Sequence, residues 1–408
     1  MAEPASPASP GPPAPPPLDG VRVLDLATMM AAPAAAAYLA EFGADVIKVE
    51  KPKEGDPQRR WGTRKDGESI FWKSISRNKR SLTLDLRTSR GAEILRLLIQ
   101  RSDVVIANFR PGTLESWGIG YQWMAEANPG VILLEISGFG QHGPLARRPG
   151  FGTLAEARSG FAHLTGQPDG PPTLPNMGLA DGVAGIMGAL AVMLALRAKE
   201  RGDGLGQRID LSLCDPVLRL IEPSLLDWSQ LGVAGQRTGS RSVHVAPRNV
   251  YRCRDGSWVA LSASTPSTAR RVFAAIGRPE LAEDPRFVDN GARLENVEEL
   301  DQVIGEWIAK HPASEVIAVM EQAEAAVGPV QDIPQIHLDP SFQERPSFVE
   351  VRDPHLGLMQ LVDVVPRLSR TPGRVRTTGP ALGQHTGEIL AELGLAGEQG
   401  RLEEEGVV

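Results

Sequence analysis

The feature that most constrains the fold of this chain is an alternation of short apolar segments and longer amphipathic ones between residues 21 and 137. Strands are predicted at 21–26, 45–50, 81–85, 103–107 and 131–137, and helices at 31–42, 90–101 and 124–128. Strands separated by a helix run parallel, because a tight hairpin cannot join them. The pattern therefore predicts an α/β fold in which helices cover both faces of a parallel sheet.

The second half of the chain predicts a smaller unit. After a long helix expected over 183–199, the composition between residues 232 and 240 shifts to Gly, Arg, Thr and Ser, which indicates a linker. A hairpin over 247–263 and helices at 269–276, 297–310 and 313–326 follow. A turn at Gly328–Pro329 is expected to end this unit. We predict a large domain built from 18–229 and 328–395, and a small domain with its linkers over 230–327.

The two ends of the chain predict tails instead of folded structure. Residues 1–17 contain eight prolines and no apolar core, which favours a disordered or polyproline-like segment. A ligand for a proline-binding module is the alternative interpretation of this segment. Residues 396–408 are rich in glutamate and are expected to form a frayed acidic tail.

Charge and composition exclude several functions. Lysine and arginine total 43 against 50 acidic residues, so a net charge of −7 disfavours nucleic acid and anionic membranes as partners. The longest charge-free apolar stretch, 183–196, is shorter than the ~18 residues that a membrane span requires. Two cysteines, and seven histidines without metal-ligand spacing, predict neither a disulfide framework nor a metal site. We therefore expect a protein of a reducing compartment, the cytoplasm.

A glycine-rich loop follows the strand predicted at 131–137. The segment 138–143, GFGQHG, matches the G-x-G-x-x-G pattern of dinucleotide-binding proteins. Pro144 and the run Arg147-Arg148-Pro149 come next, so no helix begins at the third glycine to receive a pyrophosphate. The sequence therefore disfavours NAD or FAD as a cofactor.

Asp181 lies in the segment GLADG, directly before the most apolar helix of the chain. One interpretation is an ordinary helix N-cap, which is a common role for aspartate. The other is a carboxylate nucleophile, because the positive end of the helix dipole would hold the carboxylate ionised. Glycines at 178 and 182 would let a bulky substrate approach the backbone.

Basic residues are concentrated early in this acidic chain. They are Lys48, Lys51, Lys53, Arg59, Arg60, Arg64, Lys65, Arg77, Lys79 and Arg80. The cluster predicts either local binding of an anion such as phosphate or a solvated charged surface. The segment 108–112, NFRPG, directly follows a predicted strand, at the end of a parallel sheet where ligands of α/β proteins bind.

Several of these segments together resemble the class III CoA-transferases, the family of formyl-CoA transferase and the carnitine CoA-transferases. The resemblance extends from about Leu18 to Leu395. It rests on 19–59, NKRSLTLDL (78–86), NFRPG (108–112), ISGFGQHGP (136–144), GLADG (178–182) and PALGQHTGEILAELGL (380–395).

The resemblance implies a Rossmann-like large domain with a smaller inserted α+β domain, in an interlocked homodimer. It implies that Asp181 is the catalytic nucleophile and that a CoA thioester is a substrate, with no permanently bound cofactor. The residues implied to contact CoA are Met29, Met30, Lys51, Lys79, Asn108 and Phe109. Backbone N–H groups near Gly182 and in the loop of Gly138, Gly140 and Gln141 are expected to stabilise oxyanions.

Three positions depart from the family pattern. Ser116 replaces an arginine that is common in the family, and Ser137 replaces a lysine of formyl-CoA transferases. Phe151 occupies the position of a histidine in the related 2-methylacyl-CoA racemases, which exchange a proton between two bases. A racemase and a non-catalytic CoA-binding protein remain the alternatives to a CoA-transferase.

The sequence does not identify the donor and acceptor acids. A dicarboxylic acceptor would require a cation for its second carboxylate. Arg241, His244 and Arg248, near the linker, are the candidates for this role, and a purely structural role is the alternative.

Overall fold

The computed structural model describes residues 14–345 and 347–408, which form two compact units. The first unit contains 14–161, 175–222 and 345–408, and the second contains 162–174 and 223–344. Most of the proline-rich segment, residues 1–13, lies outside the described residues. Leu18, the expected start of the folded chain, is buried, and its amide donates to the Phe42 carbonyl oxygen at 3.0 Å.

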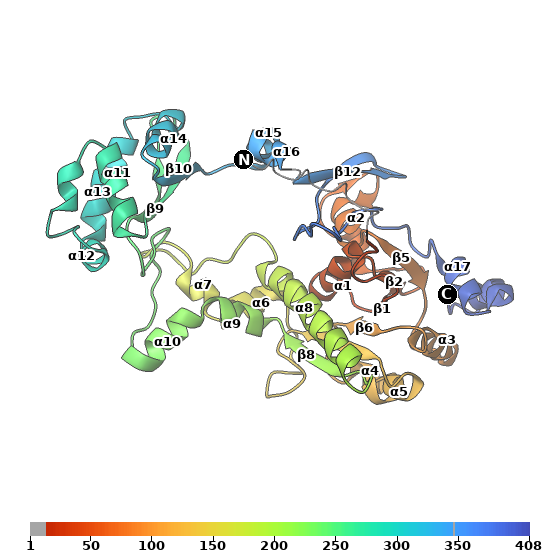
Figure 1. Ribbon diagram of the computed structural model, residues 1–408. Helices are drawn as coiled ribbons and strands as arrows, with labels where there is room; N and C mark the ends of the chain where they lie inside the picture. Colours follow the sequence, from red (N-terminus) through yellow and green to blue (C-terminus); the bar gives the residue numbers. More distant parts are fainter. Residues whose placement is uncertain (1–13, 346) are drawn as a thin grey trace, which may run out of the picture. The chain divides into compact units, whose positions relative to one another are not determined.

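A six-stranded parallel sheet forms the centre of the first unit, which confirms the predicted α/β class (Figure 1). Its strands, from one edge to the other, are β5 (Lys79–Thr83), β2 (Asp45–Glu50), β1 (Arg22–Asp25), β6 (Val104–Ala107), β7 (Ile132–Ser137) and β8 (Arg208–Ser212). The chain proceeds from β1 to one edge and then returns to begin β6 on the other side of β1. The carboxyl ends of β1 and β6 therefore form a topological switch point, where open α/β sheets bind ligands.

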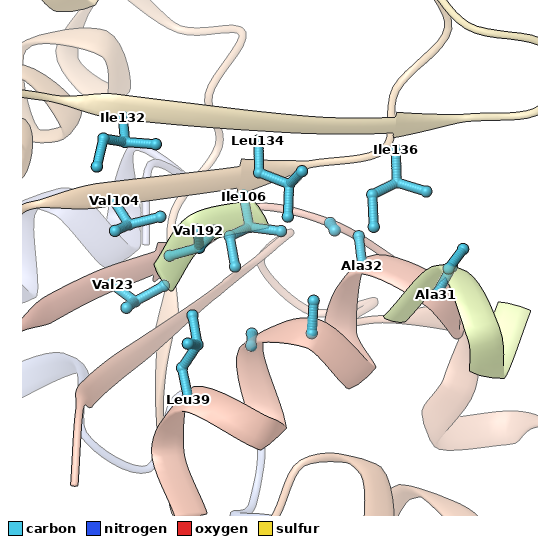
Figure 2. Close-up of a cluster of buried hydrophobic side chains, with 14 of the residues drawn as sticks. Val23, Ala31, Ala32, Leu39, Val104, Ile106, Ile132, Leu134, Ile136 and Val192 are labelled. Atoms are coloured by element: carbon cyan, nitrogen blue, oxygen red, sulfur yellow. The ribbon is translucent and has the colours of Figure 1, made fainter. Parts of the chain in front are cut away.

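Alternate side chains of the strands enter two separate cores. Val23, Val104 and Ile106 pack with α1 (Ala31–Glu41) and α8 (Leu179–Arg201), as Figure 2 shows. The opposite face packs against α3 (Ser89–Ile99), α5 (Tyr121–Ala127), α17 (Thr386–Glu392) and α18 (Gln399–Glu404). Both faces are covered, as the near-continuous apolar character of the central strands predicts.

The predicted frayed tail at 396–408 is wrong. Leu402, in α18, is fully buried in the second core, and Val407 and Val408 are buried with it. The Asp85 amide also donates to the Val407 carbonyl oxygen at 2.8 Å. Glutamates dominate the composition of this segment, but the few apolar residues between them decide its structure.

Helix α8 is longer than predicted and has two different faces. Small residues on one face allow close packing on α1, since a Cβ at Gly185 would lie 2.9 Å from the Ala34 Cβ. The other face leaves Ile186, Leu190 and Leu194 exposed. Contrary to the expectation from 183–196, the 23-residue helix is long and apolar enough to span a membrane, by length and composition only.

The second unit contains an antiparallel sheet in the order β11 (Ala326–Pro329), β10 (Trp258–Ser262) and β9 (Arg248–Arg252). Pairing of Trp258 with Arg252 confirms the predicted hairpin. Helices α11 (Pro266–Ala275), α13 (Val297–Ile308) and α14 (Ala313–Gln322) share its core. Gly328 and Pro329, expected to form a turn, instead belong to β11, where Pro329 pairs with Val259.

The other elements of the described chain are short. The helices are α2 (Ile70–Ile75), α4 (Thr113–Ser116), α6 (Gly152–Arg158), α7 (Phe161–Leu164), α9 (Cys214–Leu220), α10 (Glu222–Leu231), α12 (Asn290–Glu295), α15 (Ile333–Leu338) and α16 (Pro340–Glu344). Two hairpins pair β3 (Arg64–Lys65) with β4 (Glu68–Ser69) and β12 (Phe348–Asp353) with β13 (Gly357–Val362).

Candidate active site

The switch point of the sheet opens into a cavity of about 200 Å³, here called the Asp181 cavity. The segments that follow β1, β6 and β7 line it, together with the residues before α6 and the first turn of α8. Of the residues predicted from the sequence, the cavity brings together Met29, Met30, Asn108, Phe109, Gly138 and Asp181.

Asp181 is not the N-cap of α8. The N-cap is Gly178, which makes no side-chain capping bond, and Asp181 is the third helical residue. Glu156, on α6, supplies the capping oxygen instead, because its Oε1 accepts the Ala180 amide at 3.1 Å. The Asp181 carboxylate is therefore released from the capping role that its sequence context favoured.

The electrostatic environment of Asp181 differs from the expectation. Burial, with a smaller contribution from the negative charge of Glu156, raises the pKa of Asp181 to about 6. The helix N-terminus was expected to favour ionisation, but desolvation disfavours the charged form more strongly. With this pKa, ~90% of the carboxyl groups are ionised at pH 7, so the side chain is both a competent nucleophile and weakly solvated.

Two glycines make room for the Asp181 carboxylate. A Cβ at Gly152 would lie 2.3 Å from Asp181 Oδ2, and one at Gly178 would lie 2.8 Å from the Met30 Cε. Gly182, by contrast, has open space around its Cα. Its amide is also occupied, because it donates to the Gly178 carbonyl oxygen at 2.9 Å. The structure therefore does not support Gly182 as an oxyanion donor.

The glycine-rich loop reaches the Asp181 cavity at one end only. Gly138 lines the cavity, and its Cα lies so close to Gly150 that a Cβ would be 2.6 Å from the Gly150 Cα. Gly140 adopts a φ of 81° and lies near Asp210. The Gln141 amide donates to both Asp210 carboxylate oxygens at 3.0 Å, so it is not free to stabilise an oxyanion.

The segment after β1 is held in a strained conformation. Met29 has a φ of 68°, which a non-glycine residue rarely adopts, and its amide donates to Asp56 Oδ1 at 3.2 Å. The Asn108 side chain accepts the Thr28 amide at 2.8 Å and donates to the Thr28 carbonyl oxygen at 2.6 Å. Asn108 thus fixes the cavity wall, because both ends of its amide bond to the backbone.

A second cavity of about 290 Å³, here called the Lys51 cavity, shares Thr28 and Phe109 with the first. Lys51, Arg60 and Arg87 give it cationic groups. Its apolar wall includes Trp117, whose ring meets that of Phe109 at 5.0 Å and 69°. The two cavities together offer an apolar and basic region at one end and a carboxylate at the other.

Lys79 does not reach either of these two cavities. Its ammonium group is fully buried, 2.8 Å from Asp25 Oδ2 and 2.7 Å from the Pro33 carbonyl oxygen. Burial lowers the pKa of Lys79, although the charge of Asp25 opposes this effect. The structure therefore does not support the expectation that Lys79 contacts CoA. Its buried ammonium group has a structural role instead.

Much of the early basic cluster is neutralised inside the protein. Lys48 Nζ is buried 3.0 Å from Asp56, Arg59 pairs with Glu50 at 2.7 Å, and Arg80 pairs with Asp45 at 2.7 Å. Lys51 and Arg60 remain exposed. The interpretation of the whole cluster as an anion-binding surface is wrong, because sequence proximity does not show which cations have acidic partners.

The positions that depart from the family pattern have different surroundings. Ser116 is exposed, and its hydroxyl donates to the Thr113 carbonyl oxygen at 2.7 Å. Ser137 and Phe151 both line the Asp181 cavity; Phe151 is 67% exposed and is the N-cap of α6. A phenyl ring cannot act as the second base of a proton exchange.

The cations proposed near the linker are engaged within the second unit. Arg241 Nε donates to Asp301 at 2.6 Å, and Arg248 donates to the Ser240 carbonyl oxygen at 2.8 Å. The hydroxyl of Tyr251 also bonds to Asp301 at 2.6 Å, which completes a buried network. Arg241 therefore has a structural partner, and His244, three residues further along the chain, is exposed.

Sequence reasoning missed Glu156 and the role of α6. Glu156 lies in an ordinary helical segment, and only the tertiary packing of α6 on α8 brings it to the Ala180 amide. No spacing signal could have identified it. Within 14–345 and 347–408, no group of three or more His, Cys, Asp or Glu side chains has the arrangement of a metal site.

A doubly covered parallel sheet with a ligand cavity at its switch point defines the class of an α/β ligand-binding protein or enzyme. Comparison with known proteins identifies the group within that class: residues 18–386 match CoA-transferase family III, and the chain belongs to this family. It is 42% identical over 378 residues to the succinyl-CoA–D-citramalate CoA-transferase of Chloroflexus aurantiacus, covering 92% of this chain and 94% of that protein.

Two further comparisons agree with this assignment. The succinate–glutarate CoA-transferase of Agrobacterium fabrum is 33% identical, covering 92% of this chain and 96% of that protein. A crystal structure of a CAIB/BAIF family protein from Brucella suis superposes with a TM-score of 0.81 at 30% identity, covering 93% and 100%. The protein is therefore a class III CoA-transferase, which moves CoA from an acyl-CoA to a carboxylic acid, as the resemblance predicted.

Proposed function

We propose that Asp181 is the covalent acyl and CoA carrier of this transferase. The observation that carries the proposal is the position of its carboxylate: in the wall of the switch-point cavity, not used as a helix cap, and half-desolvated. Covalent catalysis by a carboxylate needs such a group, ionised at neutral pH and reachable by substrate.

Each step exchanges one carboxyl derivative for another. An Asp181 oxygen attacks the thioester carbon of the donor, the C–S bond breaks, and CoA leaves as thiolate from a mixed anhydride. The thiolate then attacks the aspartyl carbonyl carbon, and the donor leaves as a free carboxylate. The acceptor carboxylate repeats these two steps in reverse order, which returns Asp181 as a carboxylate. No proton or external energy source is consumed, because the successive species are all activated carboxyl groups.

The two cavities, which share Thr28 and Phe109 in their walls, support a binding mode for CoA. We place the nucleotide in the Lys51 cavity and the thiol end in the Asp181 cavity, with the pantetheine arm passing Thr28 and Phe109. Lys51 pairs with Glu54, and both side chains are exposed, whereas the exposed Arg87 pairs with the largely buried Asp85. An exposed ion pair contributes only about 0–1 kcal/mol, so Lys51 can exchange its partner for phosphate at little cost.

The wall of the Asp181 cavity supports a transferase over a racemase. Among the described residues that line it, Asp181 is the one side chain with a pKa suited to a base near neutral pH. Proton exchange at a carbon requires a second base on the opposite side of that carbon. Phe151 cannot fill this role, so nothing in the cavity favours the racemase alternative.

The exposed apolar face of α8 supports a homodimer. A cavity of about 550 Å³ on this face is lined by Leu190 and Met193 of α8 and by Val365 and Leu368. An apolar surface of this kind is typical of a protein interface. We propose that a second copy of the chain covers it, in the interlocked arrangement that the family resemblance implies. Two free cysteines, Cys214 and Cys253, agree with the proposed cytoplasmic location.

The substitution Asp181→Asn tests the carrier. Loss of a nucleophile reduces turnover by about 10⁴-fold or more. Because burial and the charge of Glu156 together raise the pKa of Asp181 from 3.8 to about 6, ionisation in the folded state costs on the order of 3 kcal/mol at neutral pH. The neutral amide avoids this cost, so the variant is expected to unfold at a higher temperature while being inactive. CoA exchange is measured with succinyl-CoA, and unfolding is followed by calorimetry.

Trapping the intermediate provides the second readout. Addition of hydroxylamine after the donor acyl-CoA should convert Asp181 into its hydroxamate, which mass spectrometry of the peptide locates. The control is Asp203→Asn, at an exposed turn, which should leave exchange and trapping unchanged. An Asp181→Asn variant with near wild-type exchange would end the proposal.

A further inference from the structure

Two arginines in the wall of the Asp181 cavity lack partners. Arg110 follows Phe109 after β6, Arg148 lies in the segment before α6, and both are exposed. Within the part of the chain that the structure describes, neither guanidinium group forms an ion pair or a side-chain hydrogen bond. Nearby arginines such as Arg59 and Arg80 are paired with carboxylates. Other exposed arginines, such as Arg147, also lack a partner among the described residues, so the position of Arg110 and Arg148 in the wall of the Asp181 cavity is what makes them candidates for binding a ligand.

These cations do not neutralise Asp181. Burial and Glu156 are the groups that shift the pKa of Asp181, both upwards, and no cation opposes them. The cavity therefore carries positive charge and a carboxylate in the same wall without an ion pair between them. A ligand that fits this pattern has a reactive carbonyl group at one end and a separate negative charge at the other.

A third observation points to a ligand in the same cavity. Ser137, at the carboxyl end of β7, is 7% exposed and its Oγ has no hydrogen-bond partner. Buried hydroxyl groups almost always have a partner, and one without it leaves a desolvation cost of about 1–3 kcal/mol. Ser137 lines the Asp181 cavity, so a bound acyl group would supply the missing acceptor.

We propose that Arg148, assisted by Arg110 and by the Ser137 hydroxyl, binds the distal carboxylate of a short dicarboxylic acyl group whose thioester carbon lies at Asp181. This rests on the proposed function of Asp181. A guanidinium group suits the task, because it is permanently charged and donates two parallel hydrogen bonds to a carboxylate. The substrates that this site selects are dicarboxylic acids, with the free acid end always directed to the arginines.

A phosphate of CoA is the other anion that could bind Arg148. The Lys51 cavity already offers three cations for the nucleotide, and neither Arg110 nor Arg148 lines it. The position of the two arginines beside Asp181 therefore favours the acyl end of the substrate. An acyl-pantetheine donor, which lacks the nucleotide and its phosphates, distinguishes the two sources.

The test compares Arg148→Gln with Arg147→Gln. Arg147 is its exposed neighbour and lines a different cavity, so it controls for the loss of one positive charge in this segment. Acetyl-CoA is the donor, and the acceptors are succinate and butyrate, which differ in the second carboxylate. Arg148→Gln is expected to lower kcat/KM for succinate about 10- to 100-fold and to leave butyrate nearly unchanged. Arg148→Lys should restore part of the loss, and Ser137→Ala should give a smaller one.

The outcomes separate this inference from the proposed carrier. An equal loss for succinate and butyrate, or an equal effect of Arg147→Gln, would overturn the role of Arg148 even with Asp181→Asn inactive. An equal loss for both acceptors with acetyl-CoA that disappears with S-acetylpantetheine as donor would assign Arg148 to a CoA phosphate instead. If Asp181→Asn remained active, the succinate-to-butyrate ratio would still report on Arg148, because it does not depend on the covalent step.

Discussion

The first unit contains two groups of charged residues with opposite organisation. Beside β1, the side chains of Asp25, Lys48 and Lys79 are fully buried, and Asp25 pairs with both lysines, at 3.7 Å from Lys48 and 2.8 Å from Lys79. In the Asp181 cavity, Arg110 and Arg148 are exposed and have no partner among the described residues. Charges of the first kind hold the backbone, and charges of the second kind are available to a substrate.

The buried group has a clear structural task. Although burial raises the pKa of Asp25, Lys48 and Lys79 together hold it below its usual value. Asp56, which also pairs with Lys48, accepts the amide of the strained Met29. The buried charges therefore fix the segment that forms one wall of both cavities, and they act on catalysis only through that wall.

The largest effect is expected from breaking the buried group. Lys79→Met removes one partner and leaves Asp25 partly uncompensated in the interior, which costs about 3–5 kcal/mol of stability. Chemical denaturation of the variant and the wild-type protein measures this loss. Lys51→Met, at an exposed ion pair, is the matched control and should change stability by less than about 0.5 kcal/mol.

Lys51→Met, together with Arg148→Gln, sharpens the comparison on the side of binding. Lys51→Met should raise the KM for acyl-CoA, because it removes a cation from the Lys51 cavity. Arg148→Gln should leave stability unchanged within about 0.5 kcal/mol, since no protein carboxylate loses a partner. A Lys79→Met protein of wild-type stability with a raised KM for acyl-CoA would restore Lys79 as a CoA contact and contradict the division drawn here.

The next effect concerns the space around Asp181. Gly152→Ala places a Cβ 2.3 Å from Asp181 Oδ2, so the carboxylate must move. A displaced nucleophile of this kind typically costs about 100-fold in rate. Gly182→Ala is the control, because its Cβ would meet nothing within 4 Å, and alanine in a helix gains about 0.5–1 kcal/mol over glycine.

We expect opposite results for the two glycine variants when CoA exchange rates and denaturation curves are measured. Gly152→Ala should be slow with nearly unchanged stability, and Gly182→Ala should be active and slightly more stable. The reverse result, a slow Gly182→Ala enzyme, would show that the substrate approaches the helix backbone at Gly182, as the sequence predicted.

Much of the fold could be predicted because its signals are local. The apolar run at β7 and the Arg-Asp-Gly turn between β9 and β10 depend on neighbours in sequence. The site could be predicted in part, because Asp181, Asn108 and Phe109 lie in motifs at strand ends and at a helix start. Family resemblance supplied their roles, and composition alone did not.

The parts that could not be predicted depend on contacts between distant segments. Lys79 is not available to a ligand because it pairs with Asp25, which lies 54 residues away in sequence, whereas Lys51 has no such buried partner. The Glu156 cap joins α6 to α8 across 24 residues. The wrong expectation for 396–408 has the same origin, because Leu402 is buried by a core whose other members lie in distant strands and helices. Sequence identifies which residues carry charge, but pairing decides what each charge does.

The smallest predicted effect tests that statement on Glu156, whose carboxylate accepts an amide in the first turn of α8. Glu156→Gln keeps an oxygen that can accept the Ala180 amide and removes the negative charge that raises the pKa of Asp181. Since a deprotonated Asp181 is the active form, kcat/KM of the wild-type enzyme should fall as the pH drops through about 6. In Glu156→Gln this acidic limb should move to lower pH, while remaining above that of a solvated aspartate because burial is unchanged.

The control for this measurement is Glu126→Gln, at an exposed position of α5, a helix on the opposite face of the sheet from α8, which removes one negative charge without touching the surroundings of Asp181. Its pH profile should coincide with that of the wild-type enzyme. An acidic limb that stays in place in Glu156→Gln would mean that burial alone sets the pKa of Asp181. Glu156 would then belong with the buried charges beside β1, as a group that holds backbone and does not tune the nucleophile.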